Sequence, residues 1–142
     1  LPIFSFFQRD NEEAARVLEI GAQRSTHNAA AMQKLAVMLR AEQFADERLA
    51  FNYLTQQRDS ATDPKLRDML DKRVIRLQGL IHLRAAQRRY KAEHGPLTDL
   101  QQLINQGVIA ELPADPLRLG YELRNGRIEL KKLKIAGLEE QP

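Results

Sequence analysis

The sequence contains no cysteine and no tryptophan among its 142 residues. The lack of cysteine excludes disulfide bonds, thiolate metal sites and cysteine nucleophiles, and it leaves the redox compartment open. Aromatic residues make up only 6% of the chain. Few rings are therefore available to stack against bases or sugars, which argues against a nucleic-acid partner.

Long apolar runs are missing as well. No stretch approaches the roughly 18 consecutive apolar residues of a membrane-spanning helix, so we expect no transmembrane segment in this piece. The apolar opening at residues 1–7 lacks the basic flank and small-residue cleavage site of an intact signal peptide. We expect a fragment of a longer chain. The sequence leaves open its oligomeric state and whether a signal, an anchor or further repeats precede residue 1.

Patterns typical of catalysis and metal binding are also missing. The three histidines, His27, His82 and His94, lie at no metal-ligand spacing, whereas a helical zinc pair would occupy positions i and i+4. The sequence has no glycine-rich phosphate loop and no G-x-S-x-G motif. We therefore predict that the protein is not an enzyme and that it uses no metal and no cofactor.

Charge is nearly balanced, with 22 basic and 19 acidic residues and a net charge of +3. One side of a predicted long helix is nevertheless basic, because it carries Arg73, Arg76, Arg84, Arg88 and Arg89. This side could bind an anionic partner such as nucleic acid, a membrane surface or an acidic protein. It could equally be the solvated face of an amphipathic helix, and the acidic residues interspersed nearby favour that interpretation.

Apolar residues recur at helical spacing over most of the chain. This periodicity predicts helices at residues 3–8, 11–23, 29–42, 46–58 and 64–94. Asp10, Asn28 and Asp63 are placed to cap the helices that follow them, and Pro64 suits a first helical position. Gly79 lies inside the longest helix, where it marks either a bend or a close helix contact.

Turn signals dominate the C-terminal third. Gly95-Pro96 is a firm helix stop, because glycine suits the left-handed end position and proline cannot continue a helix. Thr98 and Gln101 match a capping box for a short helix that follows. The prolines at positions 113 and 116 predict a stiff, extended connection.

Asn125-Gly126 is the preferred sequence of a two-residue β-hairpin turn. Such a turn pairs Tyr121 with Leu130 and Leu123 with Ile128, which places all four side chains on one apolar face. We expect the short helix and the end of the long helix to cover this face.

These elements together predict a mainly α fold with two helical hairpins and a long helix, followed by a short helix and a C-terminal β-hairpin. We predict helical hairpins at residues 1–62 and a long connecting helix at 63–94. A short helix plus β-hairpin should follow at 95–134, with a flexible tail at 135–142.

Three of the predicted helices combine small and large apolar residues in a recurring way. The residues are Ala14, Leu18 and Gly21 in one helix, Leu35, Ala36 and Leu39 in the next, and Ala50 and Leu54 in the third. Gln57 departs from this pattern, because a small residue would complete it there. The pattern resembles tetratricopeptide (TPR-like) repeats, which are helical hairpins that stack into a solenoid. The resemblance implies a groove for a protein or peptide, with Gln33, Val37 and Arg40 facing the partner.

A second pattern consists of Tyr90, Gly95, Pro96, Leu100, Leu103, Gly107, Leu112, Pro113, Asp115, Pro116, Gly120 and Tyr121. It is similar to the globular part of the major pseudopilins of type II secretion. Their calcium-binding end has no counterpart after Leu130, and their hydrophobic assembly helix has none either. The resemblance therefore does not extend to calcium binding or pseudopilus assembly, and it implies a unit that caps the helical array.

We expect this protein to be a non-catalytic protein–protein interaction module or scaffold of a bacterial TPR-like protein. Two alternatives stay open. One is a subunit or accessory factor of a secretion or pilus-like envelope assembly, suggested by the pseudopilin-like segment. The other is a binder of anionic surfaces or nucleic acid through the basic side of the long helix. The compartment stays undecided, although the family resemblance slightly favours the cell envelope or periplasm.

Overall fold

The computed structural model describes residues 3–24, 28–135 and 138–140. The fold is mainly helical, as predicted, with helical hairpins, a long helix, a short helix and a C-terminal antiparallel hairpin. The chain divides into two compact units, which we call unit 1 (Leu1–Val74) and unit 2 (Ile75–Pro142). The long helix continues from unit 1 into unit 2.

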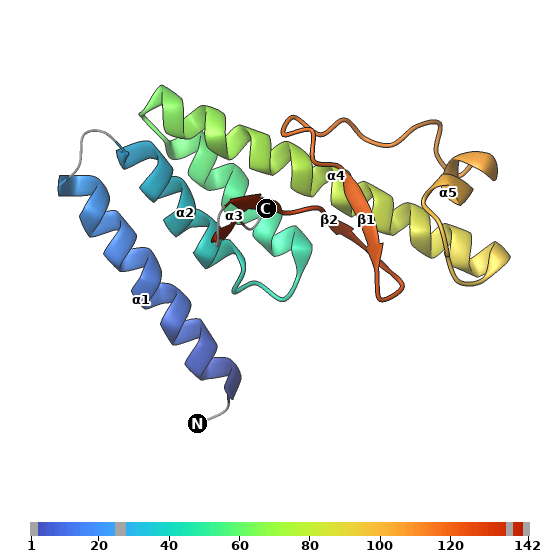
Figure 1. Ribbon diagram of the computed structural model, residues 1–142, viewed down its shortest axis with the longest axis horizontal. Helices are drawn as coiled ribbons and strands as arrows, with labels where there is room; N and C mark the ends of the chain where they lie inside the picture. The colour runs from blue at the N-terminus through green and yellow to red at the C-terminus, as the bar shows by residue number, and fades with distance from the viewer. Residues whose placement is uncertain (1–2, 25–27, 136–137, 141–142) are drawn as a thin grey trace. The chain divides into compact units, whose positions relative to one another are not determined.

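Unit 1 consists of helical hairpins (Figure 1). Its helices are α1 (Ile3–Arg24), α2 (Ala29–Ala41), α3 (Glu47–Ser60) and the first part of α4 (Pro64–His94). The prediction of two separate helices before residue 24 is wrong, because α1 is continuous and Asp10 lies inside it. The segment contains no proline or glycine before Gly21, so polar residues alone mark the predicted break, and they are tolerated within a helix.

Side-chain caps begin two of these helices. Asp63 Oδ1 accepts a hydrogen bond from Lys65 N at 2.9 Å, which confirms the predicted cap of α4. Asp46 Oδ1 accepts from Arg48 N at 2.8 Å in the same way at the start of α3. Asn28 occupies the corresponding position before α2, but its side chain forms no capping hydrogen bond, so that predicted cap is wrong.

The core of unit 1 is built mainly from small side chains. Its buried apolar residues are Ala15, Ala22, Ala30, Ala36, Val37, Met38, Ala41, Ala50, Leu54, Leu70 and Val74. Gly21 continues this pattern, because a Cβ atom at that position would lie only 3.2 Å from Met32 Sδ. The short side chains therefore allow α1 and α2 to approach closely.

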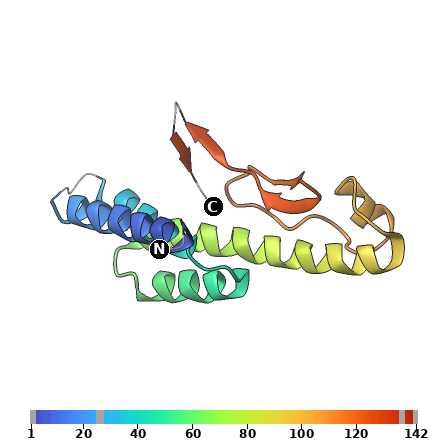
Figure 2. The same ribbon diagram turned by 90° about the horizontal axis from the view of Figure 1, so that it is seen from below.

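Unit 2 contains the rest of α4 together with α5 (Gln101–Asn105), β1 (Tyr121–Arg124) and β2 (Arg127–Leu130). The strands pair antiparallel in the predicted register, with Tyr121 opposite Leu130 and Leu123 opposite Ile128. Asn125 and Gly126 have φ angles of 54° and 77°, as a primed two-residue turn requires. Figures 1 and 2 show this hairpin running beside the second half of α4.

One hydrophobic cluster holds unit 2 together. Its buried members are Leu80, Leu83, Ala86, Tyr90, Leu97, Leu103, Ile109, Tyr121, Ile128 and Leu130. The apolar face of the hairpin thus packs against α4 and α5, which confirms the predicted cover. Gly95, with a φ of 83°, directly follows the last residue of α4, as predicted.

The capping box of α5 lies one residue later than predicted. Gln102 Oε1 accepts hydrogen bonds from the backbone N–H groups of Thr98 (3.0 Å) and Asp99 (3.3 Å). Asp99 Oδ1 in turn accepts from Gln101 N at 3.0 Å. Asp99 and Gln102, rather than Thr98 and Gln101, therefore supply the side-chain acceptors at the start of α5.

Two short strands, β3 (Leu133–Ile135) and β4 (Leu138–Glu140), pair antiparallel near the C-terminus. Ile135 and residues 138–140 belong to the segment for which we predicted a flexible tail, and they are paired in these strands. No helix in the described ranges has both the length and the apolar composition needed to cross a bilayer.

Candidate binding groove

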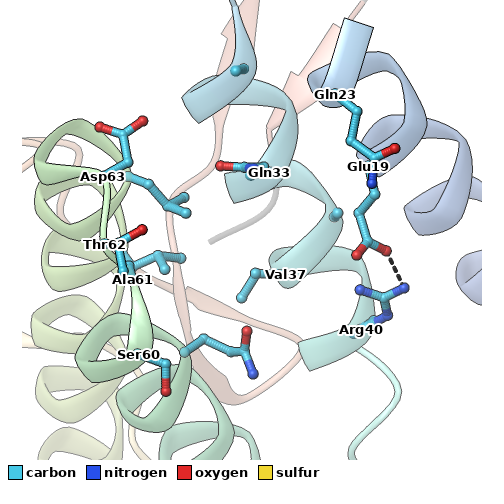
Figure 3. Close-up of a pocket in the computed structure, with 14 residues that line it drawn as sticks. Glu19, Gln23, Gln33, Val37, Arg40, Ser60, Ala61, Thr62 and Asp63 are labelled. Atoms are coloured by element: carbon cyan, nitrogen blue, oxygen red, sulfur yellow. Dashed lines mark hydrogen bonds and ion pairs between the residues drawn. The ribbon is translucent and has the colours of Figure 1, made fainter.

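The three residues predicted to face a partner line one groove in unit 1. Its volume is about 450 Å³. The residues that line it are Glu19, Gln23, Ala29, Gln33, Ala36, Val37, Arg40, Gln57, Ser60, Ala61, Thr62, Asp63, Leu66 and Leu70. Figure 3 shows Gln33 and Val37 directed from α2 toward the 60–63 segment, with Arg40 and Glu19 facing each other on the α1 side.

Helical geometry explains why α2 forms the floor of this groove. Its lining positions are 29, 33, 36, 37 and 40, and this spacing places the residues on one face of an α-helix. Helix α1 contributes one wall through Glu19 and Gln23. The other wall comes from the end of α3, the α3–α4 connection and the start of α4.

The groove combines an apolar base with polar groups at its edges. Ala36, Val37 and Leu70 are buried beneath it, and Leu66 adds aliphatic surface from α4. Gln33 and Gln57 each carry an amide that can both donate and accept hydrogen bonds, and the hydroxyl of Ser60 can do the same. This combination suits a ligand that presents both apolar side chains and backbone-like polar groups.

Arg40 connects the groove to α1. Its Nη2 atom lies 3.0 Å from Glu12 Oε1, and the same nitrogen also donates to Glu19. The hydrogen bond from Arg40 lowers the pKa of Glu12, and the two carboxylates raise the pKa of the Arg40 guanidinium further. Both glutamates belong to α1, so Arg40 holds α1 against α2 at the edge of the groove.

Two of the three predicted groove residues also stabilise unit 1. Val37 is only 7% exposed and belongs to the core, and Arg40 forms ion pairs within unit 1. Substituting either residue would therefore disturb the fold as well as the groove. Gln33 is partly buried and is not part of the buried core, so of the three it is best suited to a test of binding.

The predicted basic side of α4 does not form one exposed face. Arg73 and Arg76 are buried, with exposures of 6% and 1%. Arg84 lies 2.9 Å from Glu129 Oε2 and donates from Nε to Ile128 O at 3.1 Å. Only Arg88 and Arg89 of the five are exposed. The prediction is wrong for this surface, because in unit 2 the hairpin covers arginines that helical periodicity alone assigns to solvent.

Arg76 and Asp115 form the most deeply buried ion pair among the described residues. Arg76 Nε lies 3.0 Å from Asp115 Oδ1, and Arg76 Nη2 donates to Lys131 O at 2.6 Å. Burial acts to raise the pKa of Asp115, but the N–H groups of Gly120 and Leu117 and the Arg76 cation outweigh it, so that this pKa is lowered. The pair joins α4, the 115–120 turn and the end of the hairpin, so it has a structural role.

No group of three or more histidine, cysteine, aspartate or glutamate side chains comes together as a metal site in the described part of the chain. His82 and His94 lie on α4 and are exposed, and the His94 ring lies 4.9 Å from the Tyr90 ring. His27 lies outside the described residues. The absence of a metal or cofactor stays a prediction.

No protein-family model, no curated protein and no solved structure matches this chain. The resemblances to tetratricopeptide repeats and to pseudopilins therefore stay predictions. Any functional conclusion rests on the groove and on the residues that form it.

Proposed function

We propose that unit 1 is a peptide-binding module of a non-catalytic interaction protein, and that the groove along α2 is its binding site. The main support is that Gln33, Val37 and Arg40, which the resemblance to tetratricopeptide repeats implies as partner-facing residues, line the same groove. Residues far apart in the sequence complete it, from Glu19 on α1 to Leu70 on α4.

The size of the groove favours a short segment over a folded partner. Its volume of about 450 Å³ lies within the range of roughly 300–1,000 Å³ that is typical of ligand pockets. A peptide in extended conformation exposes backbone N–H and C=O groups that need partners when they are buried. The amides of Gln33 and Gln57 and the hydroxyl of Ser60 can supply those partners, while the apolar base accommodates side chains.

A random-peptide display library, selected against the full chain, tests this function. The blocking variant is Ser60→Trp, because Ser60 is exposed and lines the groove at the end of α3. The matched control is Asn52→Trp, because Asn52 is exposed on the same helix and does not line the groove. We expect Ser60→Trp to weaken the selected peptides at least about tenfold, which corresponds to about 1.4 kcal/mol.

A second pair of variants tests the polar contacts separately. Gln57→Ala removes an amide from the groove, whereas Gln56→Ala removes an exposed amide from the same helix outside it. We expect weaker binding only for Gln57→Ala, by about fivefold if one hydrogen bond of about 1 kcal/mol is lost. Peptides that bind both tryptophan variants and the parent chain equally would contradict the proposal.

A further inference from the structure

The two walls of the groove each present a carboxylate. Glu19 lies on α1, with a side chain that is 43% exposed, and Asp63 lies at the start of α4. Arg40 is the only basic side chain among the described residues that line the groove. The sign of the charge around the groove therefore depends on whether the Arg40 charge is compensated.

Arg40 is compensated by two carboxylates. It forms ion pairs with Glu12 and Glu19, and its hydrogen bond lowers the pKa of Glu12. Among the charged side chains that line the groove, Glu19 and Asp63 are negative and Arg40 is positive. The groove is acidic in a chain whose net charge is +3, so its sign does not simply follow the overall composition.

Asp63 remains able to bind a cation while it caps α4. Its Oδ1 atom accepts from Lys65 N, which uses one carboxylate oxygen in the cap. With the described residues, Asp63 forms no ion pair. A carboxylate offers about four acceptor positions, so Asp63 can accept further hydrogen bonds from a ligand that enters the groove.

From these charges we infer that the groove selects peptide segments that carry a lysine or arginine beside an aliphatic residue. This inference rests on the proposed function and specifies its ligand. The cation would lie against the carboxylates of Glu19 and Asp63, and the aliphatic side chain would contact the apolar base near Val37. The same charges disfavour polyanions, because phosphate groups would face two acidic walls.

Four fluorescent hexapeptide mixtures provide the test, titrated against the full chain by fluorescence polarisation. Each mixture has one fixed central residue, either lysine, arginine, glutamine or glutamate, and equal proportions of alanine, leucine and serine elsewhere. We expect the lysine and arginine mixtures to bind at least about tenfold more tightly than the glutamate mixture. Their advantage should shrink between about 50 mM and about 500 mM sodium chloride, because salt screens exposed charges.

Asp63→Asn is the decisive variant, because asparagine keeps the ability to cap a helix and removes only the charge. We expect it to weaken the lysine mixture about three- to fivefold and to leave the glutamine mixture unchanged. Asp68→Asn is the matched control, because Asp68 is an exposed aspartate on α4 that does not line the groove.

The outcomes separate this inference from the proposed function. One outcome is that Ser60→Trp abolishes binding while the parent chain binds all four mixtures equally. The groove then binds peptides, and the inferred preference is wrong. A preference for the glutamate mixture leads to the same conclusion. If no mixture binds, or if Ser60→Trp leaves all binding intact, the proposed function fails and the inference fails with it.

Discussion

Arg76 Nε lies 3.0 Å from Asp115 Oδ1, and the two side chains are 1% and 5% exposed. This pair links α4 to the turn at residues 115–120, where Asp115 also accepts hydrogen bonds from Leu117 N, Leu119 N and Gly120 N at 2.9, 2.9 and 2.7 Å. Asp115 is therefore both hydrogen-bonded and paired with a cation, and removing either charge of the pair leaves the other without compensation.

Breaking this ion pair should strongly destabilise the protein. We expect Arg76→Met or Asp115→Asn to lower the free energy of unfolding by about 3–5 kcal/mol, because each variant leaves a buried polar group without its partner. The double variant should cost less than the sum of the two single losses. Urea unfolding followed by circular dichroism measures these differences.

The exposed pair between Lys72 and Asp68 is a suitable control for that experiment. These side chains are 42% and 66% exposed, and the two charged atoms are 3.2 Å apart. Lys72→Met should cost no more than about 1 kcal/mol, because water screens the charges. Equal losses for Lys72→Met and Arg76→Met would contradict the importance assigned to the buried pair.

Gly79 is required for the close contact between α4 and the hairpin. A Cβ atom at this position would overlap the Tyr121 hydroxyl and lie 3.1 Å from Pro113 Cβ. We expect Gly79→Ala to lower the melting temperature, because overpacking costs about 1–3 kcal/mol and outweighs the gain of about 1 kcal/mol in helix propensity. Gln78→Ala, an exposed neighbour on α4, should not lower it.

Tyr121→Phe tests the origin of that clash. The Tyr121 hydroxyl is buried and has no hydrogen-bond partner among the described residues, so its removal alone should cost little. In the Gly79→Ala background the same change should recover part of the lost melting temperature, because it removes the overlapping oxygen. If the melting temperature does not recover, the strain lies elsewhere, for example at Pro113.

Lys34 should make stability depend on pH. It is 8% exposed, and burial, with a smaller contribution from Arg73, lowers its pKa from 10.5 to about 8. Between about pH 8 and pH 10.5, Lys34 is protonated in the unfolded chain and largely neutral in the folded chain. The unfolded chain therefore binds more protons than the folded chain, so the free energy of unfolding should rise with pH. The rise should be of the order of 2–3 kcal/mol between about pH 7 and pH 10.5.

Denaturant titrations at several pH values check this expectation. Lys34→Met should abolish the rise, whereas Lys65→Met, at an exposed position, should retain it. Burial raises the pKa of Tyr53 and Tyr121, which lowers stability above about pH 10, but this effect is common to all three chains. Parallel curves for the parent chain and Lys34→Met would show that Lys34 does not titrate as described.

Local patterns were sufficient to predict several parts of the structure. The Asp63 cap, the end of α4 at Gly95 and the register around Asn125-Gly126 are all confirmed. Each depends on a few neighbouring residues whose backbone preferences agree. The face of α2 that contains Gln33 was also predictable, because helical periodicity determines which residues share a face.

Predictions that depended on distant partners were wrong or incomplete. Helical periodicity assigns Arg76 and Arg84 to a solvated surface, whereas Asp115 and Glu129 bind them in unit 2. The alternatives for Gly79 were resolved only by the position of Tyr121. In the groove, periodicity alone did not show that Arg40 bonds to Glu12 and Glu19 on α1.

The sequence by itself determined where most helices and turns begin and end, because those choices follow from short-range backbone and capping preferences. Only the tertiary structure decided which arginines are buried, which glycine permits a close contact and which carboxylates surround the groove. The physical reason is that such pairings bring together residues that are far apart along the chain. Their energy depends on burial and distance in the folded protein, and neither quantity is encoded at a single position.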